Sequence, residues 1–200
     1  MPEDLLARLL QGLAATSPAE AGAVVLGLAY VVLAARRSRW CWVAGALSSL
    51  ILAVLAWQAR LPMQAVLNIW YVLMSAYGWY HWSRESGTVI RLWPAWKHLA
   101  GVAASLIVAA SAASWLSAGT QAAWPYLDSA TTLLSLLATW LVARMVLENW
   151  IYWIVIDAVL VFLFAAQGLV FVALQFVIYL VVAVVGFISW IRLYRQQSRA

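Results

Sequence analysis

Two tryptophans and an aspartate lie at helical spacing within one of the most apolar stretches of the chain. Trp150, Trp153 and Asp157 occupy positions i, i+3 and i+7. At about 100° per residue, these positions fall within roughly 60° of arc, so a helix here presents all three on one face. Indole rings attract cations and stack on flat rings, and a carboxylate balances positive charge. The trio therefore suits a flat, positively charged ring.

Asp157 has no obvious cationic partner in the sequence. Ionisable residues inside a membrane are costly and mark functional sites by default. No lysine or arginine lies at mid-depth in any predicted span, so Asp157 must be protonated, hydrogen-bonded, hydrated or paired with a cationic ligand. A hydrogen-bonded structural aspartate is the alternative. Tryptophans also anchor membrane interfaces, which is the interpretation favoured for Trp124 and open for Trp150.

Other polar side chains at membrane depth could form hydrogen bonds with the hydroxyls of a ribose. They are neutral donors and acceptors, and in a membrane they could equally form helix–helix hydrogen bonds. The candidates are Asn68, Tyr71, Thr131, Gln175 and Tyr179.

The composition places the chain in a membrane. Hydrophobic residues make up 66% and charged residues 10%, against about 45–50% and about 25% in soluble domains. The net charge of +5 is better explained by residues flanking membrane helices than by nucleic-acid binding. The sequence has no phosphate-binding P-loop, no metal-site spacing and no catalytic triad, so we expect neither an enzyme nor a cofactor.

Seven stretches are long and apolar enough to be transmembrane helices. They cover residues 19–35, 40–58, 62–82, 98–117, 125–144, 147–165 and 169–191. Residues 1–18 carry a short leucine stripe beside acidic residues and predict an interfacial helix, with a frayed terminus as the alternative. Residues 193–200 form a basic tail. Ten of the twelve basic residues fall on one side of these spans, which predicts an outside N-terminus and a cytoplasmic C-terminus.

The second half of the sequence repeats the first. Aligning 20–84 with 128–192 without gaps gives 14 identities in 65 positions. Eight are leucine or alanine pairs that composition could produce. The other six are Arg36/Arg144, Trp42/Trp150, Tyr71/Tyr179, Gly78/Gly186, Trp82/Trp190 and Arg84/Arg192.

This repeat predicts a 3+1+3 architecture. Residues 19–84 and 125–192 each hold three spans, and residues 85–124 supply a loop and a linker helix that makes the two units parallel. The plan is similar to that of the SWEET sugar transporters, and substrate sites in such transporters lie at the repeat interface. A duplicated helical scaffold without transport function is the alternative.

The residues from Glu148 to Asp157, with Gly186 to Trp190 and the run from Asn68 to Tyr80, resemble the PnuC family of vitamin transporters. The most specific element is Trp-x-x-Trp-x-x-x-Asn/Asp, matched here by Trp150, Trp153 and Asp157. The resemblance implies seven helices in a bacterial inner membrane, a homotrimer, and facilitated diffusion of nicotinamide riboside. It also implies trapping of the vitamin by a cytoplasmic kinase.

The substrate within that family is left open. Nicotinamide riboside is cationic, aromatic and ribose-bearing, which matches the candidate residues. Thiamine is also cationic and aromatic and fits nearly as well, whereas riboflavin is neutral and larger and would use Asp157 less. A membrane scaffold that transports nothing is the remaining alternative.

Overall fold

The structure, a computed structural model, describes residues 16–60, 62–84, 89–119 and 124–199. Within these residues the chain is helical, and no β-strand forms. The helices are α2 (Pro18–Ala35), α3 (Trp40–Gln58), α4 (Pro62–Trp82), α5 (Ala95–Gly119), α6 (Pro125–Ala143), α7 (Asn149–Ala166) and α8 (Val170–Gln197). The all-helical prediction is confirmed. Most of the interfacial segment predicted over 1–18 lies outside the described residues.

Six of these helices, all except α4, are long and apolar enough to cross a membrane. The prediction that all seven stretches share this character is therefore met only in part. α4 is 21 residues long and carries polar side chains, among them Gln64, Asn68 and Ser75, that face a cavity between the helices. α8 extends as helix through residue 197, into the segment assigned from the sequence to the basic tail.

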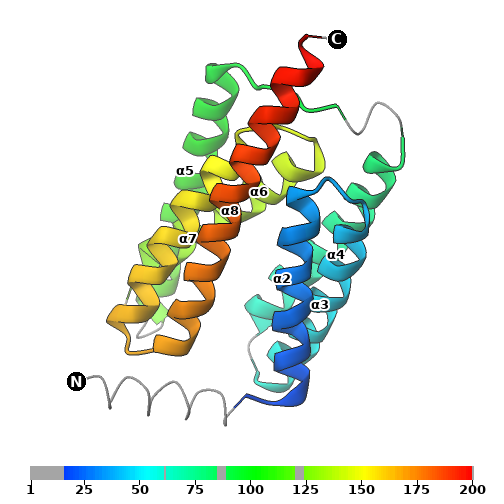
Figure 1. Cartoon of the computed structure of the whole chain (residues 1–200). Coiled ribbons are helices and arrows are strands. Elements are labelled where there is room, and N and C mark those ends of the chain that lie inside the picture. The colour runs from blue at the N-terminus through cyan, green and yellow to red at the C-terminus, as the bar shows by residue number, and fades with distance from the viewer. Residues whose placement is uncertain (1–15, 61, 85–88, 120–123, 200) are drawn as a thin grey trace, which may run out of the picture.

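The helices form two neighbouring groups (Figure 1). α2, α3 and α4 pack in sequence and make up the first half of the molecule, while α6, α7 and α8 make up the second half. α5 packs on α6. Two further contacts, α2 with α8 and α4 with α6, join the halves. The repeat alignment pairs α2 with α6 and α4 with α8, so each of these contacts is the counterpart of the other.

Turns at equivalent positions of the two halves have the same backbone conformation. Arg37 after α2 and Met145 after α6 both have a φ of 55°, and Arg60 after α3 and Gly168 after α7 have φ values of 57° and 76°. In each of the four turns, the backbone N–H of the residue with positive φ donates to the carbonyl three positions earlier at 3.0 Å. A left-handed residue after the last turn is a common way to satisfy the free carbonyls of a helix end.

Four buried tryptophans pack together near the end of the molecule where α2 and α6 finish, and we call them the tryptophan quartet: Trp42, Trp82, Trp150 and Trp190. None is more than 3% exposed. The Trp42 and Trp82 rings meet edge-on at 5.3 Å, and the Trp150 and Trp190 rings do so at 5.6 Å, both with an interplanar angle of 83°. Trp82 and Trp190 approach each other to 6.3 Å, so the quartet spans both halves.

Two glycines make room for this packing. A Cβ atom on Gly78 would lie 2.2 Å from the nearest ring atom of Trp42, and a Cβ on Gly186 would lie 2.7 Å from the Trp150 ring. Real Cβ atoms do not approach so closely. Only glycine therefore allows the indoles of Trp42 and Trp150 to pack directly against the backbones of α4 and α8. The two glycines are aligned with each other in the repeat, as are the two tryptophans.

Most of the basic residues gather at the end of the molecule where α2 and α6 finish. Backbone hydrogen bonds join Arg91 to the α6–α7 turn at Met145 and Leu147, and the Ile90 N–H donates to the Gln197 side chain. The ends of α4 and α8 and the start of α5 therefore lie at this same end. The basic residues near it are Arg36, Arg37, Arg39, Arg84, Arg91, Lys97, Arg144, Arg192, Arg195 and Arg199.

Candidate functional site

A cavity of about 410 Å³ lies between the two halves. Its walls come from α2, α3 and α4 on one side and α6, α7 and α8 on the other, while none of the described α5 residues lines it. Sites for small molecules commonly have volumes of about 300–1,000 Å³ and combine an apolar lining with a few polar groups. The cavity is therefore large enough for a vitamin-sized solute.

All eight residues predicted to bind substrate line this one cavity. They are Trp150, Trp153, Asp157, Asn68, Tyr71, Gln175, Tyr179 and Thr131. They come from four helices, α4, α6, α7 and α8, so the fold brings together residues that lie far apart in the sequence. Their role toward a substrate remains a prediction.

Asp157 is buried in this cavity without a partner among the described residues. It is 3% exposed and forms neither a hydrogen bond nor an ion pair with them. Trp150 and Trp153 precede it along the same cavity-lining face of α7, and the Trp150 indole N–H is buried and unpartnered. A carboxylate removed from water in this way strongly favours a neighbouring positive charge.

The other predicted polar groups are mostly bonded within their own helices. The Asn68 side chain donates to the backbone carbonyl of Gln64 at 2.9 Å, and the Thr131 hydroxyl donates to the backbone carbonyl of Asp128 at the same distance. Such bonds leave lone pairs and the remaining amide proton free for a ligand.

Gln175 and Tyr179 form a pair on α8. The Gln175 amide donates to the Tyr179 hydroxyl at 3.0 Å. Gly27 on α2 allows this hydroxyl to approach, because a Cβ there would lie 2.8 Å from it. The pair therefore projects from α8 toward α2.

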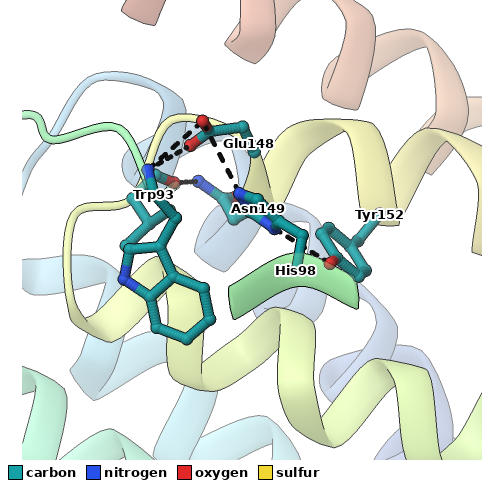
Figure 2. A network of polar contacts seen from close by, with 6 residues as sticks. Trp93, His98, Glu148, Asn149 and Tyr152 are labelled. Atoms are coloured by element: carbon teal, nitrogen blue, oxygen red, sulfur yellow. Dashed lines mark hydrogen bonds and ion pairs between the residues drawn. The ribbon is translucent and has the colours of Figure 1, made fainter. Parts of the chain in front are cut away.

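A polar network holds the start of α7, the helix that carries Asp157 (Figure 2). The Trp93 backbone N–H donates to both Glu148 carboxylate oxygens at 3.3 and 3.4 Å. His98 on α5 contacts the same carboxylate through Nε2 at 3.6 Å and the Tyr152 hydroxyl through Nδ1 at 3.0 Å. The Asn149 side chain donates to the Val146 carbonyl at 2.6 Å. These contacts fix where α7 begins, and thereby the face that Trp153 and Asp157 present.

The sequence prediction missed several residues of the cavity. Tyr30 and Trp42 line the cavity wall formed by the first half of the molecule. The Tyr30 hydroxyl and the Trp42 indole N–H are buried without a partner among the described residues. Ser135 and Thr139 add hydroxyls along α6. The repeat held a signal for Trp42, because it aligns with Trp150, a predicted site residue. Tyr30 aligns with an alanine and gave no such signal.

A second cavity of about 430 Å³ adjoins the first near the start of α2. Residues Ser48, Leu52, Gln175 and Tyr179 line both cavities. The second cavity also includes Glu20 in the first turn of α2 and Gly168 in the turn between α7 and α8. The central cavity is therefore continued toward the end of the molecule opposite the tryptophan quartet.

Comparisons with known proteins agree on one family. The family model described as nicotinamide mononucleotide transporter matches residues 17–192. The nicotinamide riboside transporter PnuC of Escherichia coli is 26% identical over 211 residues, covering 90% of this chain and 88% of that protein. The riboflavin/roseoflavin transporter RibM of Streptomyces davaonensis is 30% identical over 182 residues, covering 88% of this chain and 85% of that protein.

A solved structure shares the fold. The crystal structure of the vitamin B3 transporter PnuC matches with a TM-score of 0.73 and 24% identity, covering 96% of this chain and 90% of that one. Together with the apolar helices, these matches describe a multi-pass membrane transporter and not an enzyme. The chain belongs to the nicotinamide mononucleotide transporter family, the family of PnuC.

Proposed function

We propose that this protein carries nicotinamide riboside across the bacterial inner membrane for the synthesis of pyridine nucleotides. One observation carries the proposal. Asp157 is 3% exposed in a cavity beside Trp150 and Trp153, and no described residue neutralises it. A pyridinium ring supplies the missing positive charge and a flat surface for the indoles.

The remaining predicted residues take the ribose in this proposal. Asn68, Tyr71, Gln175, Tyr179 and Thr131 line the same cavity and carry hydroxyl or amide groups. A ribose offers hydroxyls that both donate and accept, which such groups can match. The E. coli relative is named a nicotinamide riboside transporter, which supports this substrate.

Two other vitamins are alternative substrates. Thiamine is cationic and aromatic, so Asp157 would serve it as well. Riboflavin is supported by the relative from Streptomyces, which is named a riboflavin/roseoflavin transporter. Because riboflavin is neutral, it leaves the charge of Asp157 unused, and we rank it below the two cations. A scaffold without transport is the least favoured alternative.

We further propose a 3+1+3 arrangement, in which α5 links two parallel three-helix repeats. The turns, glycines and tryptophans that match between the aligned halves support it. The clustering of basic residues at the end where α2 and α6 finish supports a cytoplasmic location for that end and an outside N-terminus.

Transport by facilitated diffusion completes the proposal. A cytoplasmic kinase would phosphorylate the vitamin and prevent its return, and three copies of the chain would assemble into a trimer. These points rest on the resemblance to PnuC.

Uptake into vesicles tests the function. Purified protein in liposomes should admit labelled nicotinamide riboside down its gradient, with equal final concentrations inside and outside. Uphill accumulation of the unmodified vitamin under a proton or sodium gradient would contradict facilitated diffusion. Absence of uptake for nicotinamide riboside, thiamine and riboflavin alike would contradict the transport function itself.

A further inference from the structure

The tryptophan quartet closes one end of the central cavity. Trp42 and Trp150 line the cavity, whereas Trp82 and Trp190 pack edge-on against them and line neither cavity. At the opposite end the cavity shares residues with the second cavity. A solute that enters through the second cavity therefore meets the quartet at the far end of its path.

Indole–carbonyl hydrogen bonds hold the quartet across the boundary between the halves. The Trp82 indole N–H donates to the Ala143 carbonyl at 3.1 Å, and the Trp190 indole N–H is shared between the Ala35 carbonyl at 3.2 Å and the Ala34 carbonyl at 3.3 Å. The Ala35 and Ala143 carbonyls lie in the last turn of a helix, where carbonyls lack intrahelical partners. Each bond joins a helix of one half to a helix of the other, so the halves cannot part at this end while they remain.

The bonds to Ala143 and Ala35 are equivalent under the repeat. Trp82 is aligned with Trp190, and Ala35 is aligned with Ala143. In each direction, a tryptophan indole of one half therefore donates to an alanine carbonyl of the other half. The bonds to Ala143 and Ala35 are reciprocal, and Trp190 adds a second acceptor, Ala34, on the same helix end.

We propose that Trp82 and Trp190 are the gate of the transport path at the end where α2 and α6 finish. The inference rests on the proposed transport function, since a solute must leave through this end. Repeat-built transporters release substrate by moving one repeat against the other around a central site. Opening at this end requires the indole–carbonyl bonds to break.

Cys41 supplies a reporter for this opening. It is the single cysteine of the chain, it is 0% exposed, and it belongs to the same buried cluster as the quartet. A closed gate keeps its thiol from reagents, and we expect separation of α2 from α8 and of α4 from α6 to expose it.

The test replaces each gate indole by phenylalanine, which removes the N–H and keeps a ring. Trp82→Phe and Trp190→Phe in the full chain are compared with Trp57→Phe, whose side chain is 72% exposed. Labelling of Cys41 by a membrane-impermeant maleimide is followed in right-side-out and inside-out vesicles. Each gate variant should label about 3- to 10-fold faster from one membrane face only, as expected for losing one hydrogen bond from the closed state. The control should label like the parent.

A structural core would behave differently. Unchanged labelling in both gate variants would overturn the proposal, and so would faster labelling from both faces that accompanies a lost melting transition. A parent that carries none of the three vitamins would instead refute the proposed function. Faster labelling from the outer face alone would refute the proposed orientation and support the gate.

Discussion

α3 and α7 occupy equivalent places in the two halves, yet they offer the cavity different chemistry. Three of the cavity-lining positions of α3 hold Trp42, Gly45 and Ser49, and the equivalent positions of α7 hold Trp150, Trp153 and Asp157. Both helices keep the tryptophan, Trp42 or Trp150, that packs against a glycine of α4 or α8. The aromatic ring and the charge at the other two positions occur only in α7. The repeat therefore supplies the framework, and one half of it supplies the selectivity that we propose.

The two halves place aromatic side chains on different helices at equivalent positions of the repeat. A Cβ on Gly45 would lie 2.9 Å from the Tyr30 ring, so in the first half the aromatic group comes from α2 and needs a glycine on α3. In the second half Ala138 takes the place of Tyr30, and Trp153 takes the place of Gly45. Since both rings line the cavity, its two walls have aromatic surface from different helices.

Removing the charge of α7 should have the largest effect on binding. We expect Asp157→Ala to weaken nicotinamide riboside binding by about 3 kcal/mol, because a buried ligand cation loses its counter-charge. Asp157→Asn should lose less, since it keeps an acceptor oxygen. Ser49→Ala, at the equivalent position of α3, is the control and should change binding by under about 0.5 kcal/mol. Tryptophan fluorescence titration measures all three, and equal losses at both positions would contradict the proposed asymmetry.

Removing the α7-specific indole should have the next largest effect. Trp153→Ala should weaken binding by about 1–3 kcal/mol through lost stacking and apolar contact. Trp124→Ala is the matched control, because Trp124 is 46% exposed and does not line the cavity. Titration of correctly assembled protein should show little change for the control. Affinity like that of the parent for Trp153→Ala would mean that this face of α7 serves packing alone.

The shared framework should respond alike in both halves. Gly78→Ala and Gly186→Ala should each lower stability by about 1–3 kcal/mol, because the added methyl meets the ring of Trp42 or Trp150. Gly78→Ala should cost more, since its Cβ would lie 2.2 Å from the ring rather than 2.7 Å. Apparent melting temperatures in detergent measure this, with Gly22→Ala as the control because nothing lies within 4 Å of a Cβ there. A destabilisation confined to one half would argue against equivalent packing.

The two equivalent tyrosines should have the smallest effects. Tyr71→Phe and Tyr179→Phe should each weaken nicotinamide riboside binding by about 0.5–1.5 kcal/mol if the hydroxyls bond the ribose. Titration with nicotinamide riboside and with free nicotinamide, which lacks the ribose, separates this role from a structural one. Equal losses for both ligands would show that the hydroxyls do not read the ribose.

The sequence predicts the helices closely because long apolar runs between charges and prolines mark them directly. The stretches 40–58 and 62–82 coincide with α3 and α4. It also points to Asp157, since an unpaired acid in an apolar run is rare. It does not reveal which face of an apolar helix meets which neighbour, because a helix that is hydrophobic all round has no distinguishing stripe.

The missed features all depend on contacts between distant segments. The repeat marks Trp82 and Trp190 as equivalent, but their carbonyl partners lie 61 and 155 residues away. The approach of Tyr30 to Gly45 and of Tyr179 to Gly27 depends on the packing of α2 against α3 and α8. The type of a residue does not indicate which residue from a distant segment packs against it.

Charge selectivity tests the central claim most directly. Dissociation constants for nicotinamide riboside and riboflavin are measured on the parent and on Asp157→Asn under identical conditions. The account predicts that the parent binds the cation at least about tenfold more tightly, as a buried carboxylate favours positive charge. It also predicts that Asp157→Asn weakens only the cation. Tighter binding of riboflavin by the parent, or an equal loss of both ligands in Asp157→Asn, would contradict it.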